Sequence, residues 1–172
     1  MNLIKAIVAV DAGCGIGYKG ALLARIPEDQ HFFAQTTLGG IVIMGSETFY
    51  SFPNRQPLRD RINIVLTKKT DITNEKVVIC SSLEELMNTL KKYNGEKSFV
   101  IGGESVYMQL LPICEEAIVT RFHKRFMADR YFPDLEQAQG WRLKSSEELR
   151  SFDGLEYGRE IYENLRAGDF HI

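Results

Sequence analysis

Short apolar runs that alternate with amphipathic stretches are the feature that most constrains the fold of this 172-residue chain. Residues 41–44 and 99–101 are apolar without interruption, which is typical of strands covered on both faces. Strands that alternate with helices favour parallel pairing through right-handed crossovers. We therefore expect an α/β fold: a doubly wound, mostly parallel eight-stranded sheet with helices on both faces and an antiparallel C-terminal edge strand.

The pattern also gives the order of the elements along the chain. We predict strands over 3–10, 41–44, 62–66, 77–79, 98–101 and 115–122 and near 141–148 and 157–164, and helices at about 28–37, 47–51, 82–93 and 104–110. The last two strands have no clear helix between them, which predicts an antiparallel hairpin at one edge. We expect one domain over 1–165, followed by a C-terminal tail over 166–172.

Composition excludes several classes of function. A formal net charge of −2 with scattered Lys and Arg argues against nucleic-acid or membrane partners, and no stretch approaches the ~20 apolar residues that span a bilayer. The three widely spaced cysteines fit a reducing compartment, so we expect a cytoplasmic protein. We also expect a small-molecule substrate and a monomer, with an oligomer left open. The three histidines share no spacing that would place two on one face, so we expect no metal.

Two strand-to-helix corners carry glycine. Gly102 and Gly103 follow the run 98–101, and Gly45 follows 41–44, with polar residues after it that we expect to cap the next helix. Either each corner is only a tight turn, or the glycines let a ligand approach the backbone while the helix start attracts an anion. Two such corners favour a dinucleotide whose diphosphate contacts both. Further donors would be the hydroxyls of Ser46, Thr48 and Ser105.

An acid pair opens the first predicted helix. Pro27, Glu28 and Asp29 are residue types that suit a helix start, and Phe32 and Phe33 follow on the same face as Asp29. Either the two acids only cap the helix, or Asp29 faces inward and binds a flat amidine-like heterocycle through two charge-assisted hydrogen bonds. Glu28 lies about 100° round the helix and would face elsewhere.

Together with several other motifs, these features resemble the dihydrofolate reductase family in order and spacing from about residue 3 to 164. The matching segments are 9–11, 15–17, 26–29, 42–45 with Thr48, Arg61, 101–103 with Tyr107, Thr120 and 129–133. The resemblance implies an enzyme that reduces 7,8-dihydrofolate to 5,6,7,8-tetrahydrofolate. Hydride would pass from NADPH, or from NADH, to pterin C6, and N5 would be protonated.

The resemblance also implies the site residues. Asp29 would hold the pterin 2-amino group and N3 and assist protonation, Thr120 would complete that hydrogen-bond network, and Arg61 would bind the glutamate α-carboxylate as a fork. Residues 15–24 would form a loop that closes over the nicotinamide. The substrate walls would be Ile7, Phe33, Phe52, Leu58 and Ile101. The cofactor would contact Ala9, Ile16, Gly17, Gly45, Ser46, Thr48, Thr67, Lys68, Gly102, Gly103, Glu104, Ser105, Val106 and Tyr107.

Departures from the family pattern bear on both ligands. Ala24 stands where the family usually has tryptophan, so we expect weak binding of substrate and antifolates. Ser46 and Ser105 stand where arginines commonly recognise the 2′-phosphate of NADPH, which leaves NADH open as the cofactor. Lys68 and Lys69 are candidates for replacement charge.

Two other functions are compatible with the sequence. A reductase of the same fold that acts on a ribosylated aminopyrimidine in riboflavin synthesis would share both glycine corners, but Asp29, Phe33 and Arg61 suit a pterin with an acidic tail better than a sugar phosphate. A catalytically silent nucleotide-binding protein would account for the missing tryptophan. Asp29, Thr120 and the segment 15–17 favour an active enzyme instead.

Overall fold

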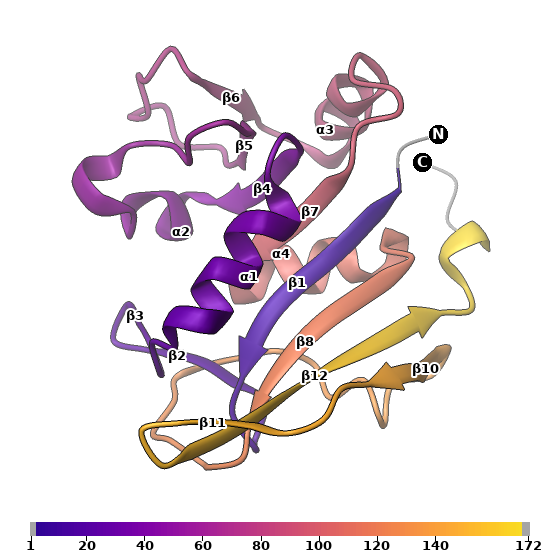
Figure 1. Cartoon of the computed structure of the whole chain (residues 1–172). Coiled ribbons are helices and arrows are strands. Elements are labelled where there is room, and N and C mark those ends of the chain that lie inside the picture. Colours follow the sequence, from indigo (N-terminus) through magenta and orange to yellow (C-terminus); the bar gives the residue numbers. More distant parts are fainter. Residues whose placement is uncertain (1–2, 170–172) are drawn as a thin grey trace.

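Six parallel strands form the centre of the molecule, seen in Figure 1, in a computed structural model that describes residues 3–169. They are β1 (Ile4–Val10), β4 (Ile41–Gly45), β5 (Ile62–Leu66), β6 (Val77–Cys80), β7 (Ser98–Gly102) and β8 (Glu116–Phe122). All six lie within one or two residues of their expected bounds. The strand order β10-β12-β8-β1-β7-β4-β5-β6 gives the predicted path of eight strands, and β11 pairs with β12 beside it.

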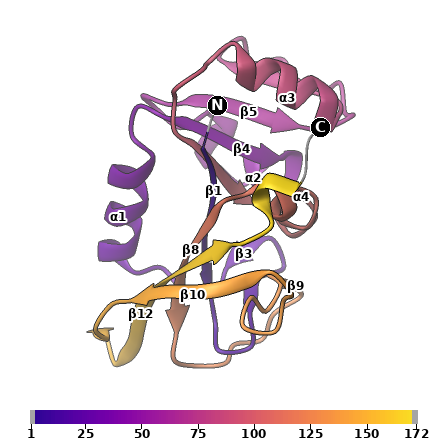
Figure 2. The ribbon, with the colours of Figure 1, turned by 90° about the vertical axis from the view of Figure 1, so that its right-hand side faces the viewer.

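The C-terminal strands form the antiparallel end of the sheet. Strand β12 (Leu155–Asn164) runs antiparallel to β8, while β10 (Trp141–Ser146) and β11 (Arg150–Phe152) both pair with β12. The predicted antiparallel C-terminal edge is confirmed: β10 pairs with the side of β12 that faces away from β8 and is the outermost strand there (Figure 2). A 3-10 turn, Ala167–Asp169, follows β12, and the end of the expected tail, 170–172, lies outside the described residues.

A second, three-stranded sheet stands where we expected a loop. Strands β2 (Gly15–Tyr18) and β3 (Ala21–Leu22) form a hairpin, and β9 (Arg130–Tyr131) pairs with β2. Lys19 and Gly20 have φ angles of 48° and 78°, as a tight two-residue hairpin turn requires. The Lys19 N–H also donates to the Asp129 carboxylate at 3.0 Å, so the hairpin is tied to the segment that carries β9.

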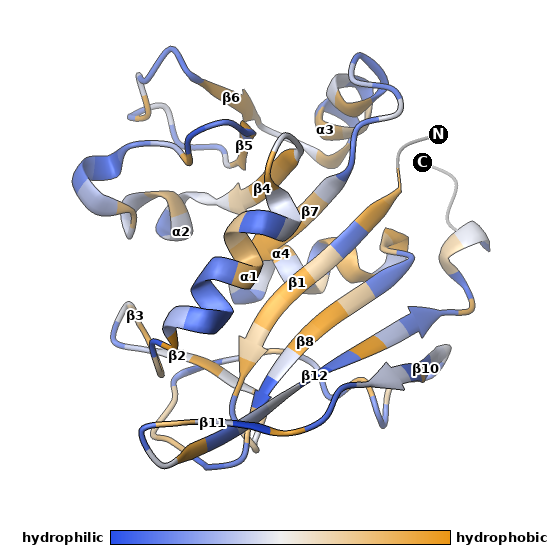
Figure 3. Ribbon diagram, in the orientation of Figure 1, coloured by the Kyte–Doolittle hydropathy of each residue, from blue (hydrophilic) through white to orange (hydrophobic). Residues whose placement is uncertain are grey.

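Helices cover both faces of the large sheet. They are α1 (Pro27–Thr37), α2 (Ser46–Tyr50), α3 (Leu83–Lys91) and α4 (Glu104–Leu110), with 3-10 turns at Pro53–Arg55 and Leu111–Ile113. Consecutive strand residues face opposite layers: Ala6 and Val8 of β1 pack in the cluster of α3 and α4, whereas Ile7 packs with the aromatic residues of α1. The central strands are accordingly apolar along most of their length (Figure 3).

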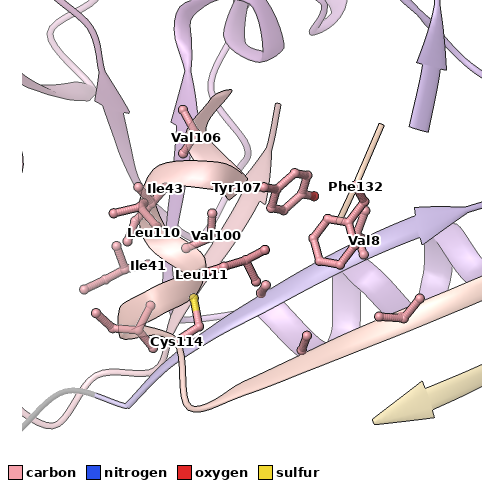
Figure 4. Packing of buried hydrophobic residues seen from close by; sticks show 14 of the residues in the cluster. Val8, Ile41, Ile43, Val100, Val106, Tyr107, Leu110, Leu111, Cys114 and Phe132 are labelled. Atoms are coloured by element: carbon pink, nitrogen blue, oxygen red, sulfur yellow. The ribbon is translucent and has the colours of Figure 1, made fainter. Parts of the chain in front are cut away.

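The largest cluster of buried residues joins α4 to the sheet (Figure 4). Leu110 and Leu111 lie over Val100, and the ring of Tyr107 meets that of Phe132 edge to face with centroids 4.9 Å apart. This core fixes α4 against β7, and therefore fixes the corner at which β7 passes into α4.

Candidate functional site

The two glycine corners adjoin at the carboxyl ends of neighbouring parallel strands. Strand β4 pairs with β7, and Met44 lies opposite Gly102. A Cβ on Gly102 would lie 3.4 Å from the Thr48 hydroxyl of α2, so Thr48 reaches across to the second corner. Gly102 has a φ of 127°, and a Cβ on Gly45 would come within 3.1 Å of the Val106 side chain. Glycine is therefore required for backbone shape and for space.

Neither corner helix is capped by a side chain. Gly45 and Gly103 are the N-cap residues of α2 and α4, and within residues 3–169 neither helix start accepts a side-chain capping bond. Our expectation that Ser46 and Thr48 cap α2 is wrong, because both lie inside the helix. By contrast, Ser82 caps α3 by accepting the Glu85 N–H at 3.1 Å. The first N–H groups of α2 and α4 are thus left for another acceptor, such as a phosphate.

The other residues assigned to the cofactor surround these corners. Glu104 accepts the Tyr131 N–H at 3.3 Å, and Thr67 Oγ1 accepts the Lys69 N–H at 3.1 Å. Ser105 lies in the first turn of α4, Lys68 follows the end of β5, and Val106 is buried. The Tyr107 hydroxyl donates to the Ile7 carbonyl at 2.7 Å, which makes Tyr107 part of the wall between core and site.

Three further assigned residues belong to the β1 and β2 strands. Ala9 lies opposite Thr120 in the β1–β8 pairing, Gly17 lies opposite Leu22 in the hairpin, and Ile16 packs against the main core.

The expected substrate walls come together as two neighbouring apolar clusters. Ile7 and Phe33 pack in a cluster with Phe99 and Ile118, whereas Phe52 and Leu58 pack in a cluster around Phe49. Ile101 contacts both clusters and joins them. Residues from β1, α1, the segment after α2 and β7 therefore form one continuous apolar surface.

Arg61 is held by hydrogen bonds from all three nitrogens of its guanidinium. Its Nε donates to Thr37 Oγ1 (3.1 Å), Nη1 to the Arg59 carbonyl (2.6 Å) and Nη2 to the Ala34 carbonyl (2.7 Å). A guanidinium has five N–H donors, so each terminal nitrogen keeps one N–H. These two N–H groups suit bidentate binding of a carboxylate.

Asp29 lies where α1, β8 and β12 meet. The Thr120 hydroxyl of β8 donates to Asp29 Oδ1 at 2.7 Å. Thr120 faces Arg159 in the β8–β12 register, and Arg159 Nε lies 3.5 Å from the same oxygen. Burial raises the pKa of Asp29 above its ordinary value, although the Thr120 hydrogen bond and the Arg159 charge act in the opposite direction. Among residues 3–169 the contacts of Asp29 go to β8 and β12, which favours the inward-facing interpretation over simple capping.

Arg159 is the residue at this site that the sequence did not reveal. Its side chain is 4% exposed, and Nη2 donates to both carboxylate oxygens of Glu28, to Oε1 at 2.6 Å. We expected Glu28 to face away from Asp29, but both carboxylates contact this one guanidinium. Arginine in a strand normally predicts a solvent-exposed position, so only a contact partner from another element can identify it.

Burial opposes ionisation of Glu28, but the hydrogen bonds from Arg159 and Tyr157 outweigh it and hold the pKa of Glu28 below its ordinary value. The Tyr157 hydroxyl donates to Glu28 Oε2 at 2.9 Å. Glu28 is therefore a charged anchor for Arg159.

A cavity of about 490 Å³ lies beside Ala24. Ile26, Phe126, Phe152 and Leu155 contribute apolar lining, and Ala24 itself packs near Ile26. An indole at position 24 would have space here.

Among residues 3–169, no group of three or more His, Cys, Asp or Glu side chains is arranged to hold a metal ion. No helix in that part of the chain has the length and apolar character needed to cross a bilayer.

Comparison with known proteins gives consistent matches. A family model described as Dihydrofolate reductase matches residues 3–164. The dihydrofolate reductase of Bacillus subtilis (strain 168) is 35% identical over 173 residues, which cover 98% of this chain and 100% of that protein. The dihydrofolate reductase of Staphylococcus haemolyticus is 32% identical, and the match covers 95% of this chain and 96% of that protein. The dihydrofolate reductase of Drosophila melanogaster is 33% identical, and the match covers 77% of this chain and 80% of that protein.

Proposed function

The chain belongs to the dihydrofolate reductase family, and from this membership we propose that it reduces 7,8-dihydrofolate to 5,6,7,8-tetrahydrofolate with NADPH as the hydride donor. The reaction is assigned from the family match, which covers residues 3–164. The observation that supports the site is the desolvated Asp29 carboxylate, which accepts the Thr120 hydroxyl at 2.7 Å beside a continuous apolar surface. The aminopyrimidine reductase and the silent nucleotide-binding protein are not favoured by these matches.

We assign the pterin ring to Asp29. Its ionised carboxylate would accept hydrogen bonds from the 2-amino group and N3, which present two adjacent donors, while Thr120 fixes Oδ1. The same group would assist protonation at N5, since burial already raises the pKa of Asp29 towards the range useful for proton transfer. The benzoyl ring would lie on the surface formed by Phe33, Phe52 and Ile101.

The glutamate tail would reach Arg61. This guanidinium is already oriented by three hydrogen bonds to the protein, and each terminal nitrogen keeps one N–H. Such preorganisation lowers the entropy cost of binding a carboxylate.

The residues at the corners fit a dinucleotide. Gly45 and Gly102 leave a surface that Cβ atoms would fill, and the uncapped starts of α2 and α4 present N–H groups beside the Thr48 hydroxyl. When bound there, the reduced dinucleotide supplies the hydride. The β2–β3 hairpin would exclude water from the reacting atoms.

Cofactor preference follows from the residues at the 2′-phosphate position. Ser46 and Ser105 are neutral, and Glu47 follows Ser46, so discrimination for NADPH over NADH would be weaker than the several-fold to about 150-fold range of a typical 1–3 kcal/mol coupling. Lys68 follows β5 and would supply the remaining positive charge there.

We further propose that the chain acts in the cytoplasm as a monomer with one domain over 1–165. Cys14, Cys80 and Cys114 are all free, as a reducing compartment would keep them.

The test is an absorbance assay of nicotinamide oxidation with purified protein, dihydrofolate and either NADPH or NADH. Oxidation that requires dihydrofolate supports the reaction, and the ratio of kcat/KM values for the two cofactors measures the preference. Absence of oxidation with both cofactors, in folded protein that binds a dinucleotide, would contradict the proposal and favour the aminopyrimidine reductase instead.

A further inference from the structure

A buried arginine at an acid pair is an uncommon arrangement that needs a physical reason. The Arg159 side chain is 4% exposed, and its guanidinium carbon lies 3.8 Å from the centroid of the Phe32 ring. Burial of a guanidinium costs free energy unless ion pairs and hydrogen bonds compensate for the lost hydration. Here the compensation comes from Glu28, which Nη2 contacts through both carboxylate oxygens.

The Nε donor of Arg159 is not compensated in the same way. It is buried and donates no hydrogen bond to any residue within 3–169, although Asp29 Oδ1 lies 3.5 Å away. The Thr120 hydroxyl already donates to this same oxygen. Asp29 Oδ2 accepts no hydrogen bond from the described residues, so the protein groups converge on one carboxylate oxygen and leave the other for a ligand.

The β8–β12 register produces this convergence. Thr120 and Arg159 are directly opposite each other, so both side chains leave the sheet on the face that α1 covers. Glu160, the next residue of β12, points to the other face and pairs there with Arg121 at 2.5 Å. One strand therefore carries two ion pairs on opposite faces, and only the Arg159 pair touches Asp29.

The charges around Asp29 come from four parts of the chain. Glu28 lies on α1, Arg159 and Tyr157 on β12, Arg150 on β11, and Glu147 between β10 and β11. Arg150 pairs with Glu28 at 3.3 Å and Arg159 with Glu147 at 3.4 Å. Tyr157 is neutral, because its hydroxyl donates to Glu28, and the two guanidiniums balance the carboxylates of Glu28 and Glu147. The single remaining negative charge is that of Asp29.

We propose that Arg159 is a positioning residue for the reaction, which keeps the Asp29 carboxylate charged and turned so that Oδ1 meets Thr120 and Arg159 while Oδ2 faces the pterin. Glu28 holds Arg159 in place. When a bound heterocycle orients the Asp29 carboxylate, Nε of Arg159 donates a hydrogen bond to Asp29 Oδ1. This inference rests on the proposed assignment of Asp29 to the pterin. Its first test does not require turnover.

The test is a ¹³C NMR titration of the Asp29 carboxyl carbon, assigned with Asp29→Asn, in wild type and three variants. Arg159→Gln removes the charge but keeps a polar group that can hydrogen-bond Glu28, and Arg159→Lys retains the charge. Arg121→Gln is the matched control, because it breaks the ion pair on the opposite face of the same two strands.

We expect the midpoint of Asp29 to rise by about one pH unit or more in Arg159→Gln, since a nearby opposite charge typically shifts a carboxyl pKa by 1–3 units. The midpoint should stay close to wild type in Arg159→Lys and in Arg121→Gln. If Arg159→Gln does not fold, Arg159→Met replaces it, because methionine removes the need for polar partners. An unchanged midpoint in a folded neutral variant, or an equal rise in Arg121→Gln, would overturn the inference.

A kinetic measurement separates positioning from simple structural damage. At pH values below the titration midpoint of Asp29 in wild type, Arg159→Gln should have a kcat/KM for dihydrofolate about tenfold lower than wild type. This difference should shrink as the pH rises above the titration midpoint of Asp29 in the variant. A loss that is equal at every pH would contradict the charge effect. If wild type itself does not turn over dihydrofolate, the proposed substrate is wrong, while the titration still decides what Arg159 does to Asp29.

Discussion

The glycine corners and the Asp29 junction are built in opposite ways. Each corner consists of neighbours in the chain, such as Gly45 with Thr48, and it offers backbone N–H groups. At the junction, Asp29 and Thr120 are 91 residues apart in the sequence, and Glu28 and Arg159 are 131 residues apart. The interactions there are made by side chains, most of them charged. A backbone site thus follows from local turn chemistry. A buried charge, by contrast, depends on which distant elements meet.

The largest expected effect comes from breaking the junction alone. Asp29→Asn should lower turnover by at least about 100-fold, as expected for loss of a positioned proton-transfer group. The dissociation constant of the dinucleotide should stay unchanged, because the corners do not contact Asp29. The measurement is kcat together with cofactor binding by fluorescence. Near-normal turnover would remove Asp29 from the mechanism.

The corners can be altered without touching the junction. Adding arginine at both neutral positions, in Ser46→Arg combined with Ser105→Arg, should raise the preference for NADPH over NADH by at least about tenfold, because one hydrogen bond to a charged group is worth about 1.5–3 kcal/mol. The ratio of kcat/KM values for the two cofactors measures this effect. Equal gains for both cofactors would show that the added charge acts on the diphosphate instead.

A smaller effect is expected at Ala24. Ala24→Trp should tighten binding of dihydrofolate and of a 2,4-diaminopyrimidine by about tenfold or less, because an indole at this position would offer these ligands more apolar surface than a methyl group does. Calorimetric titration gives the affinities. An unchanged or weaker affinity would show that another side chain completes the pocket.

The charge on Asp29 should also change the stability of the folded protein in a way that depends on pH. The pKa of Asp29 is raised in the folded protein, so this group favours folding below its unfolded value of about 3.8 and loses that contribution as pH rises through the folded pKa. Asp29→Asn should therefore raise Tm near neutral pH and change it least below that value. Thermal unfolding at both pH values tests the sign, and a Tm gain confined to acid would contradict it.

The smallest expected effect is at α3, whose start is capped by a side chain, whereas the starts of α2 and α4 are not. Ser82→Ala should remove the cap of α3 and cost about 1 kcal/mol of stability. Cofactor affinity and the Asp29 titration should not change. Weaker cofactor binding in this variant would show that α3 and the corner helices are coupled.

Much of the fold followed from periodicity. The parallel strands and all four helices lie close to their expected bounds, because buried strands and amphipathic helices repeat with different periods. The β2–β3 hairpin was missed because both strands are very short and β2 is Gly-rich, and because Lys19, which adopts a positive φ there, is not a typical turn residue.

At the site, the local parts could be predicted from the residues: glycines where the backbone must approach a ligand, an acid in the first turn of α1, and an arginine just before β5. Such features depend on neighbours in the chain and on the conformations that each residue type allows. That Arg159 faces Asp29 follows from the pairing of β8 with β12, because a strand shifted by one residue would present Glu160 instead. The arginine beside Asp29 is therefore set by strand register, which the residue types alone do not specify.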